Sequence, residues 1–240
     1  PAALAGGPIA SVVDRFIRRK KIKRPWLDAS DRRFIIGGVL GLAVLCTASI
    51  AVNGLDAHPQ FLTNSFKHRD TPLTNHMGLP TILSYKPSTV GRLTKDQRLE
   101  DPWAKWKQAR KETKHDRRWL HGLLLLGMFV LLALAGRRLA PWAVLAGSTI
   151  LIIGFIELTC YYYSFVILMA PLAIERLRYT VALILMTITG VILQFFIGWY
   201  DEQYTLETVA VLLALSYILI DVVQHPLPES SPASAADPST

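Results

Sequence analysis

The segment from Leu139 to Ile174 reads LAPWAVLAGSTILIIGFIELTCYYYSFVILMAPLAI, an apolar run interrupted near its middle by Glu157 and three consecutive tyrosines. As a single helix rising about 1.5 Å per residue it would be roughly 50 Å long, whereas the hydrocarbon core of a bilayer is only about 30 Å thick. The run therefore predicts two membrane helices, over 139–156 and 158–174. The turn between them places Glu157 to Tyr163 at one membrane face.

Similar apolar blocks of about twenty residues, the length that spans a bilayer, recur along the chain. Hydrophobic residues make up 51% of the 240 residues, and the charged residues lie mostly between the blocks. We expect further membrane helices over 34–52, 119–136, 179–199 and 205–223. The predicted fold class is all-α: a polytopic helical membrane protein with about six transmembrane helices and one long outer loop.

Hydrophilic segments separate these blocks. Residues 1–33 form a basic flank, 53–118 the long loop, 119–223 a bundle of about five helices, and 224–240 a tail rich in Pro, Ser and Ala that we expect to be disordered. Prolines and glycines in the first part of the loop predict irregular structure.

The second part of the loop opens with Asp101-Pro102, a typical helix start, and carries Trp103 and Trp106 three residues apart on one face. Two interpretations of this predicted helix stay open: a basic helix at the headgroup level, or a solvated helix leading into the membrane.

The formal net charge of +8 lies next to membrane segments, so anionic lipid and topology explain it better than nucleic acid. Two short turns are basic, Arg137-Arg138 and Glu175–Arg178, and one is acidic, Asp201–Gln203. Positive charge in short loops favours the cytoplasm. We therefore expect a bacterial inner-membrane protein with a cytoplasmic N-terminus, and with 53–118, 157–163 and 201–203 outside.

The two cysteines, Cys46 and Cys160, both lie in apolar segments and lack metal-ligand spacing. The sequence predicts no disulfide framework, no metal and no cofactor. Because the chain begins with Pro1, we expect it to be a fragment of a longer protein.

On this topology the polar loop residues share a membrane face with Glu157. A carboxylate can act as a general base on a sugar hydroxyl, cationic side chains can hold a phosphate, and tyrosines can stack on a sugar. Asp56 and Glu157 are the catalytic candidates. The candidate substrate-binding residues are Lys67, His68, Arg69, Asn75, His76, Tyr161, Tyr162 and Tyr163.

Each candidate also has a structural interpretation. The tyrosines fit an aromatic belt at the membrane interface, and Glu157 fits a solvated or helix-capping carboxylate. We expect Glu207 and Asp221, near the ends of the last helix, to be solvated.

The segments 61–68 (FLTNSFKH) and 74–79 (TNHMGL) precede 159–165 (TCYYYSF) and the proline-bearing 170–173 (APLA). In this order they loosely resemble the C-terminal half of GT-C class membrane glycosyltransferases that use polyprenol-phosphate sugars. The resemblance implies sugar transfer from a lipid phosphate at the outer face, with inversion. It also implies a catalytic Asp in the first outer loop, the position of Asp56 if the chain is complete.

The sequence thus predicts a membrane glycosyltransferase, or a C-terminal fragment of one, that contacts membrane lipids and a polyprenol-phosphate sugar donor. The alternative is a non-catalytic membrane scaffold or complex subunit. A cavity joining Asp56 or Glu157 to the basic loop would favour the enzyme, and a flat loop would favour the scaffold.

Overall fold

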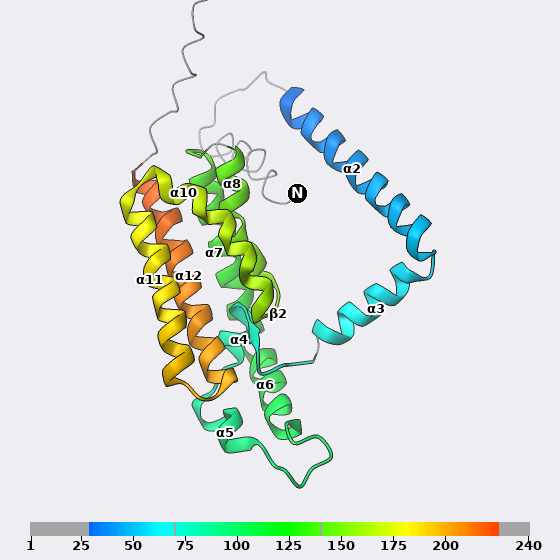
Figure 1. The fold of residues 1–240 in the computed structure, drawn as a ribbon, viewed down its shortest axis with the longest axis vertical. Coiled ribbons are helices and arrows are strands. Elements are labelled where there is room, and N and C mark those ends of the chain that lie inside the picture. Colours follow the sequence, from blue (N-terminus) through cyan, green and yellow to red (C-terminus); the bar gives the residue numbers. More distant parts are fainter. Residues whose placement is uncertain (1–28, 70, 140, 226–240) are drawn as a thin grey trace, which may run out of the picture.

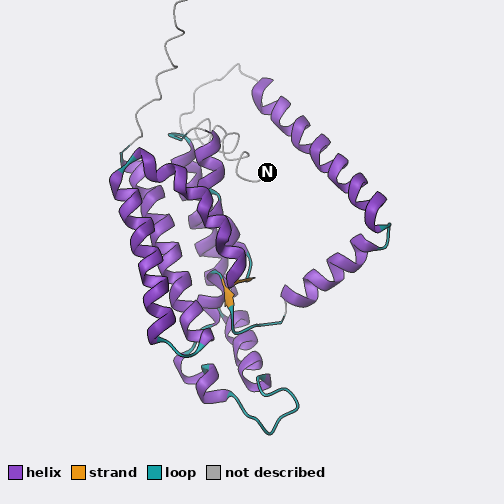
Figure 2. Ribbon diagram, viewed as in Figure 1, coloured by secondary structure: helices purple, strands orange, loops and turns teal. Residues whose placement is uncertain are grey.

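The computed structural model describes residues 29–69, 71–139 and 141–225 (Figure 1). Within these ranges the chain is helical apart from one pair of two-residue strands and short connections (Figure 2). The all-α prediction is confirmed. Most of the predicted basic flank, residues 1–28, and nearly all of the predicted tail, residues 226–240, lie outside the described residues.

Five helical segments run up and down side by side to form a bundle (Figure 1). The second and third of them are each broken in two. In chain order the segments are α7 (Arg118–Gly136), α8 (Pro141–Gly147) with α9 (Thr149–Phe155), η2 (Cys160–Met169) with α10 (Ala170–Glu175), α11 (Leu177–Phe196) and α12 (Tyr200–Gln224).

Among the described residues, four helices are long and apolar enough to cross a membrane. Their spans are Ile35–Asn53, Arg118–Gly136, Leu177–Phe196 and Tyr200–Gln224. Each overlaps a block predicted from the sequence. These helices make the chain compatible with a multi-pass membrane protein.

The two helices predicted over 139–156 and 158–174 are shorter apolar segments, Trp142–Phe155 and Cys160–Glu175. The first is interrupted at Gly147-Ser148, where the Ser148 hydroxyl donates a hydrogen bond to the Leu145 carbonyl at 2.6 Å. Such a Gly/Ser pair weakens the helical ladder. The second begins as the 3₁₀ helix η2, which rises about 2 Å per residue and so reaches further than an α-helix of equal length.

The first part of the loop is more regular than predicted, because three of its prolines lie in the first turns of helices instead of breaking them. The chain forms α3 (Ala57–Arg69), α4 (Leu79–Ser84), η1 (Pro87–Thr89) and α5 (Gly91–Thr94). Pro59, Pro80 and Pro87 each fall in a first turn, where a missing N–H has no helical partner to lose. After the predicted start at Asp101-Pro102, α6 (Ala104–Asp116) follows.

The loop is attached to the bundle by strand β1 (His76–Met77), which pairs antiparallel with β2 (Leu158–Thr159). Gly78 follows β1 with φ 137°, and a Cβ there would lie 2.5 Å from the Ile156 carbonyl oxygen. Only glycine fits this position, so the residue holds the loop against the end of α9. By contrast, α2 (Ala29–Asn53) and α3 stand away from the bundle (Figure 1).

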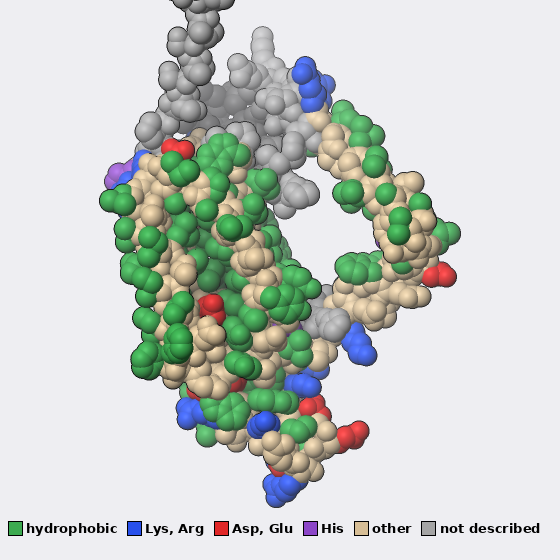
Figure 3. Space-filling model, in the orientation of Figure 1, with side chains coloured by type: hydrophobic (Ala, Val, Ile, Leu, Met, Phe, Trp, Pro, Cys, Tyr) green, Lys and Arg blue, Asp and Glu red, His purple; other side chains and the backbone are tan. Residues whose placement is uncertain are grey.

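The surface of the bundle is apolar along its sides. Figure 3 shows hydrophobic side chains over most of this face, with charged side chains gathered at the end that carries α5 and α6. Large side chains on the outer faces are exposed, among them Leu126, Ile184 and Phe195. Such a surface fits lipid contact, and the charged end fits a membrane boundary.

Candidate functional site

The loop helices α4, α5 and α6 pack where α9 ends and α12 begins, and we call this region the polar end of the bundle. Its buried polar side chains come from segments far apart in the sequence. The polar end therefore depends on tertiary packing, and it is the part of the described chain in which chemistry-bearing groups converge.

Arg110 on α6 lies at the centre of the polar end and is only 6% exposed. Its guanidinium donates hydrogen bonds to the Thr81 carbonyl (2.8 Å) and the Ser84 hydroxyl (3.0 Å), and longer ones to the Asp201 carbonyl (3.4 Å) and the Thr205 hydroxyl (3.5 Å). Burial lowers the pKa of Arg110, and the nearby carboxylates oppose that shift. Arg110 thus joins α4, α6 and α12.

The Asp201 side chain, at the start of α12, is 1% exposed. Its Oδ2 accepts hydrogen bonds from the Gly91 backbone N–H at 2.8 Å and from the Trp106 indole at 2.9 Å. The position of Asp201 in the first turn also suits the positive end of the helix dipole. Asp201 therefore fixes both the start of α5 and the ring of Trp106.

Glu157 forms a second buried ionic group, with His76 and Lys114. Its carboxylate lies 3.1 Å from Lys114 Nζ and 3.5 Å from His76 Nδ1. Burial by itself raises the pKa of Glu157, but the hydrogen bond with His76 and the charge of Lys114 outweigh burial, so its pKa lies below the usual value. Glu157 is thus a buried carboxylate paired with the loop, and not a solvated one.

A small hollow of about 10 Å³ separates the two groups and is bordered by His76, Arg110, Lys114 and Glu157. This space is about the least that can hold one water molecule. Pro72, Leu73 and Trp106 also line the hollow, and the same three residues form part of a larger cavity beside it.

The larger cavity, which we call the aromatic groove, has a volume of about 460 Å³. Its walls carry four aromatic rings together with an amide and an amine. These polar and aromatic residues are Asn75, Trp103, Trp106, Lys107, Tyr200 and Tyr204. The volume falls in the range of small-molecule sites, and aromatic rings beside hydrogen-bonding groups suit a sugar or a lipid head group.

The structure brings some of the predicted site residues together. His76 contacts Glu157, and Asn75 lines the aromatic groove. Tyr161 and Tyr162 are exposed on η2, and Tyr163 is mostly buried.

Other predicted site residues lie apart from this group. Asp56 is exposed in the turn between α2 and α3. Lys67, His68 and Arg69 form the C-terminal end of α3. Of the side chains that the structure describes here, Asp56 and Lys67 are both exposed, and neither contacts Glu157.

The expectation for Asp221 is also wrong, because its side chain is not solvated. It is 5% exposed and lies 2.8 Å from Arg176, 2.9 Å from Arg178 and 2.7 Å from the Tyr179 hydroxyl. Arg176 and Arg178, which the sequence analysis used to orient the chain in the membrane, thus also neutralise the Asp221 carboxylate. The physical reason is that α10 and α11 fold back onto the last turns of α12.

Sequence reasoning missed Arg110, Asp201 and the stripe on α12 formed by Tyr200, Gln203, Tyr204 and Glu207. The stripe could have been predicted from the sequence, because residues three, four and seven positions apart lie on one face of a helix. Arg110 could not have been predicted in this way, because nothing in the sequence distinguishes it from the other basic residues on α6.

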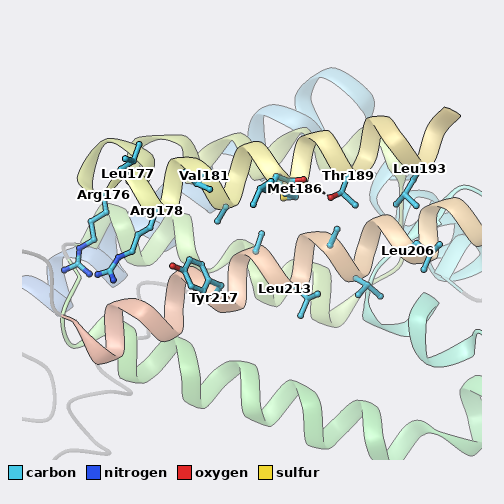
Figure 4. A pocket seen from close by; sticks show the side chains of 15 residues that line it. Arg176, Leu177, Arg178, Val181, Met186, Thr189, Leu193, Leu206, Leu213 and Tyr217 are labelled. Carbon is cyan, nitrogen blue, oxygen red and sulfur yellow. Dashed lines mark hydrogen bonds between the residues drawn. The ribbon is translucent and has the colours of Figure 1, made fainter. Parts of the chain in front are cut away.

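A third cavity, of about 1170 Å³, runs between α11 and α12 (Figure 4). Arg176 and Arg178 lie at one end of it, and most of the remaining lining is aliphatic, including Val181, Leu185 and Leu213. These side chains suit contact with lipid chains and offer no group for covalent chemistry.

Comparisons with protein families, curated proteins and solved structures give no match. Within the described ranges, no cluster of three His, Cys, Asp or Glu side chains could hold a metal ion. The functional assignment therefore rests on the residues of the polar end.

Proposed function

We propose that this chain is an integral-membrane glycosyltransferase, or the C-terminal part of one, which uses a lipid-phosphate sugar donor. The observation that carries the proposal is the aromatic groove. It adjoins the hollow of Glu157, so a cavity with sugar-binding chemistry lies between the loop and a buried carboxylate. A flat loop, as expected for a scaffold, is absent from the described part of the polar end.

The proposed roles follow from the chemistry of the lining. The rings of Trp103 and Tyr200 stack on the sugar. The Asn75 amide exchanges hydrogen bonds with the sugar hydroxyls, and Lys107 binds the phosphate of the donor. In an inverting transfer the acceptor oxygen bonds to the anomeric carbon as the bond to the lipid phosphate breaks. The acceptor's proton passes to a carboxylate, for which Glu157 is our candidate at the polar end.

The same proposal includes a topology with six membrane segments, in which Trp142–Phe155 and Cys160–Glu175 act as two short spans. The N-terminus and the turns with Arg137 and Arg176 then lie in the cytoplasm, and the polar end lies outside. The positive-inside rule supports this orientation. In intact cells, cysteines placed at the exposed positions Gln97 and Gly198 should react with an impermeant thiol reagent, and one at Glu175 should react only after lysis.

The alternative function is a non-catalytic scaffold. The buried hydrogen bonds of Arg110 and the ion pair of Glu157 with Lys114 favour it, because they attach the loop firmly to the bundle. In that case the aromatic groove would contact a partner protein instead of a sugar.

The test is sugar transfer by the purified chain in lipid nanodiscs, with polyprenyl-phosphate donors carrying radiolabelled hexoses. We expect label to leave the donor lipid with wild type and with the control Trp119→Ala, whose ring is 68% exposed on α7. We expect Trp103→Ala to slow release at least about tenfold, because it removes a stacking surface from the groove. Equal rates for both variants would refute the assignment of the groove.

A further inference from the structure

A second polar pocket lies beside the aromatic groove, between η2, α11 and α12, with a volume of about 370 Å³. Tyr204 lines both cavities, so they meet at this ring. The polar groups that line the second pocket are those of Tyr163, Thr187, Gln194, Gln203, Tyr204 and Glu207. We call it the Glu207 pocket.

Glu207 lies seven residues beyond Tyr200, about 10 Å along the axis of α12. It is therefore inside a helix that is apolar enough to span a membrane. The side chains at Tyr200, Gln203, Tyr204 and Glu207 fall on one face of that helix by their spacing. A polar stripe thus leads from the bundle end into the depth of the bilayer.

Two polar groups of this pocket have hydrogen-bonding capacity to spare. Among the described residues, Glu207 has no hydrogen-bond or ion-pair partner, and the buried Tyr163 hydroxyl has only the Thr208 side chain close to it. Ionisable side chains inside membrane helices are costly and usually serve a function. The arrangement points to a ligand that supplies the missing hydrogen bonds.

The lining determines the class of ligand. The carboxylate of Glu207 repels phosphate and accepts hydrogen bonds from hydroxyl groups, while the amides of Gln194 and Gln203 both donate and accept. Aromatic rings at Tyr163 and Tyr204 suit the apolar faces of a sugar. A hydroxyl-rich, uncharged head group fits all of these features.

The position of the pocket determines how the ligand arrives. Val191, which lines the pocket, is 49% exposed on the outer surface of α11, and Gln194 is also exposed. We propose that the Glu207 pocket binds the sugar or polyol head group of an amphiphile that enters from the bilayer. The inference goes beyond the transfer reaction, for which such an amphiphile would be a membrane-borne acceptor.

Gly190 provides a way to close the pocket. A Cβ at this position would lie 3.1 Å from Glu207 Oε1, so α11 approaches the carboxylate most closely where it lacks a side chain. Gly190→Leu should fill the space in front of Glu207. Gly127→Leu is the matched control, because a Cβ at Gly127 meets no atom within 4 Å.

The experiment labels Glu207 with dicyclohexylcarbodiimide, which reacts with carboxyl groups accessible from the bilayer. The full chain is held in nanodiscs, and the adduct is quantified by mass spectrometry. Dodecyl maltoside and dodecylphosphocholine serve as probes with the same chain and different head groups. We expect the maltoside to lower labelling about fivefold or more and the phosphocholine to leave it unchanged.

Gly190→Leu should abolish the protection and Gly127→Leu should retain it. Gln194→Leu, an exposed position that tolerates an apolar side chain in a membrane, should weaken protection while leaving the fold intact. Equal protection by both probes, absence of the wild-type adduct, or full protection in Gln194→Leu would each overturn the proposal. Protection by the maltoside without sugar transfer would support the Glu207 pocket and refute the transferase. Sugar transfer without protection would support the transferase and refute the Glu207 pocket.

Discussion

Replacing Arg110 by leucine tests whether one buried cation holds the polar end together. The substitution removes two hydrogen bonds of 2.8 and 3.0 Å and two longer ones. It also removes the guanidinium from above the Trp106 ring, 5.1 Å from its centroid. The Thr81 carbonyl and Asp201 then stay buried without this partner.

Hydrogen bonds from a charged donor contribute about 1.5–3 kcal/mol each, and each buried acceptor left without a partner costs about 1–3 kcal/mol. We expect Arg110→Leu to lower the free energy of unfolding by about 3–5 kcal/mol. Lys111→Leu is the control, because the neighbouring lysine is exposed on the same helix. The control should change stability by less than about 0.5 kcal/mol.

The assay is unfolding by SDS in mixed micelles, followed by far-UV circular dichroism. In the double variant with Asp201→Asn, the loss should be smaller than the sum of the single losses by about 1 kcal/mol or more, because the two residues share one cluster. A loss below about 1 kcal/mol for Arg110→Leu would refute the reasoning, since a buried cation with four acceptors cannot be replaced so easily.

Gly78→Ala should destabilise the protein by about 2–3 kcal/mol in the same assay, because its Cβ would lie 2.5 Å from the Ile156 carbonyl oxygen. The control Gly54→Ala should cost only about 1 kcal/mol, because this glycine has φ 82° but a Cβ there meets nothing within 4 Å. Similar losses in the two variants would contradict the close approach at Gly78. The pKa of Glu157 is lowered by His76 and Lys114, so its contribution to stability should be present at neutral pH and should be lost as pH falls below about 4. In Glu157→Gln, the free energy of unfolding should therefore depend less on pH in this acid range. An unchanged pH dependence would argue against the ion pair of Glu157 with His76 and Lys114. Asp221→Asn removes the buried carboxylate that Arg176 and Arg178 both contact, and it should cost about 2 kcal/mol. Glu175→Gln, at an exposed side chain, should be neutral, and equal effects would contradict the burial of Asp221.

Hydropathy was enough to predict the helical class and the four long apolar helices, because a run of about twenty apolar residues has few other stable arrangements. The pattern at Asp101-Pro102 also predicted the start of α6. The topology argument placed His76 and Glu157 at one end, and in the structure their side chains lie 3.5 Å apart.

Other features could not be predicted, because they depend on partners far away in the sequence. Arg110 meets the Asp201 carbonyl across 91 residues, and nothing local distinguishes it from the other basic residues of α6. Asp221 looked solvated by its position near a helix end, but the return of α11 supplies two arginines. Prolines in α3 and α4 were read as breakers, although a first-turn proline is compatible with a helix.

We propose that the aromatic groove binds the sugar of a lipid-phosphate donor, and this proposal can be tested by equilibrium binding. A polyprenyl-phosphate hexose would be titrated onto the protein in nanodiscs, with bound lipid counted by native mass spectrometry. We predict saturable binding by wild type and Trp119→Ala, and binding weaker by about tenfold or more in Trp103→Ala. Equal binding by all three proteins, or no binding by wild type, would contradict the claim.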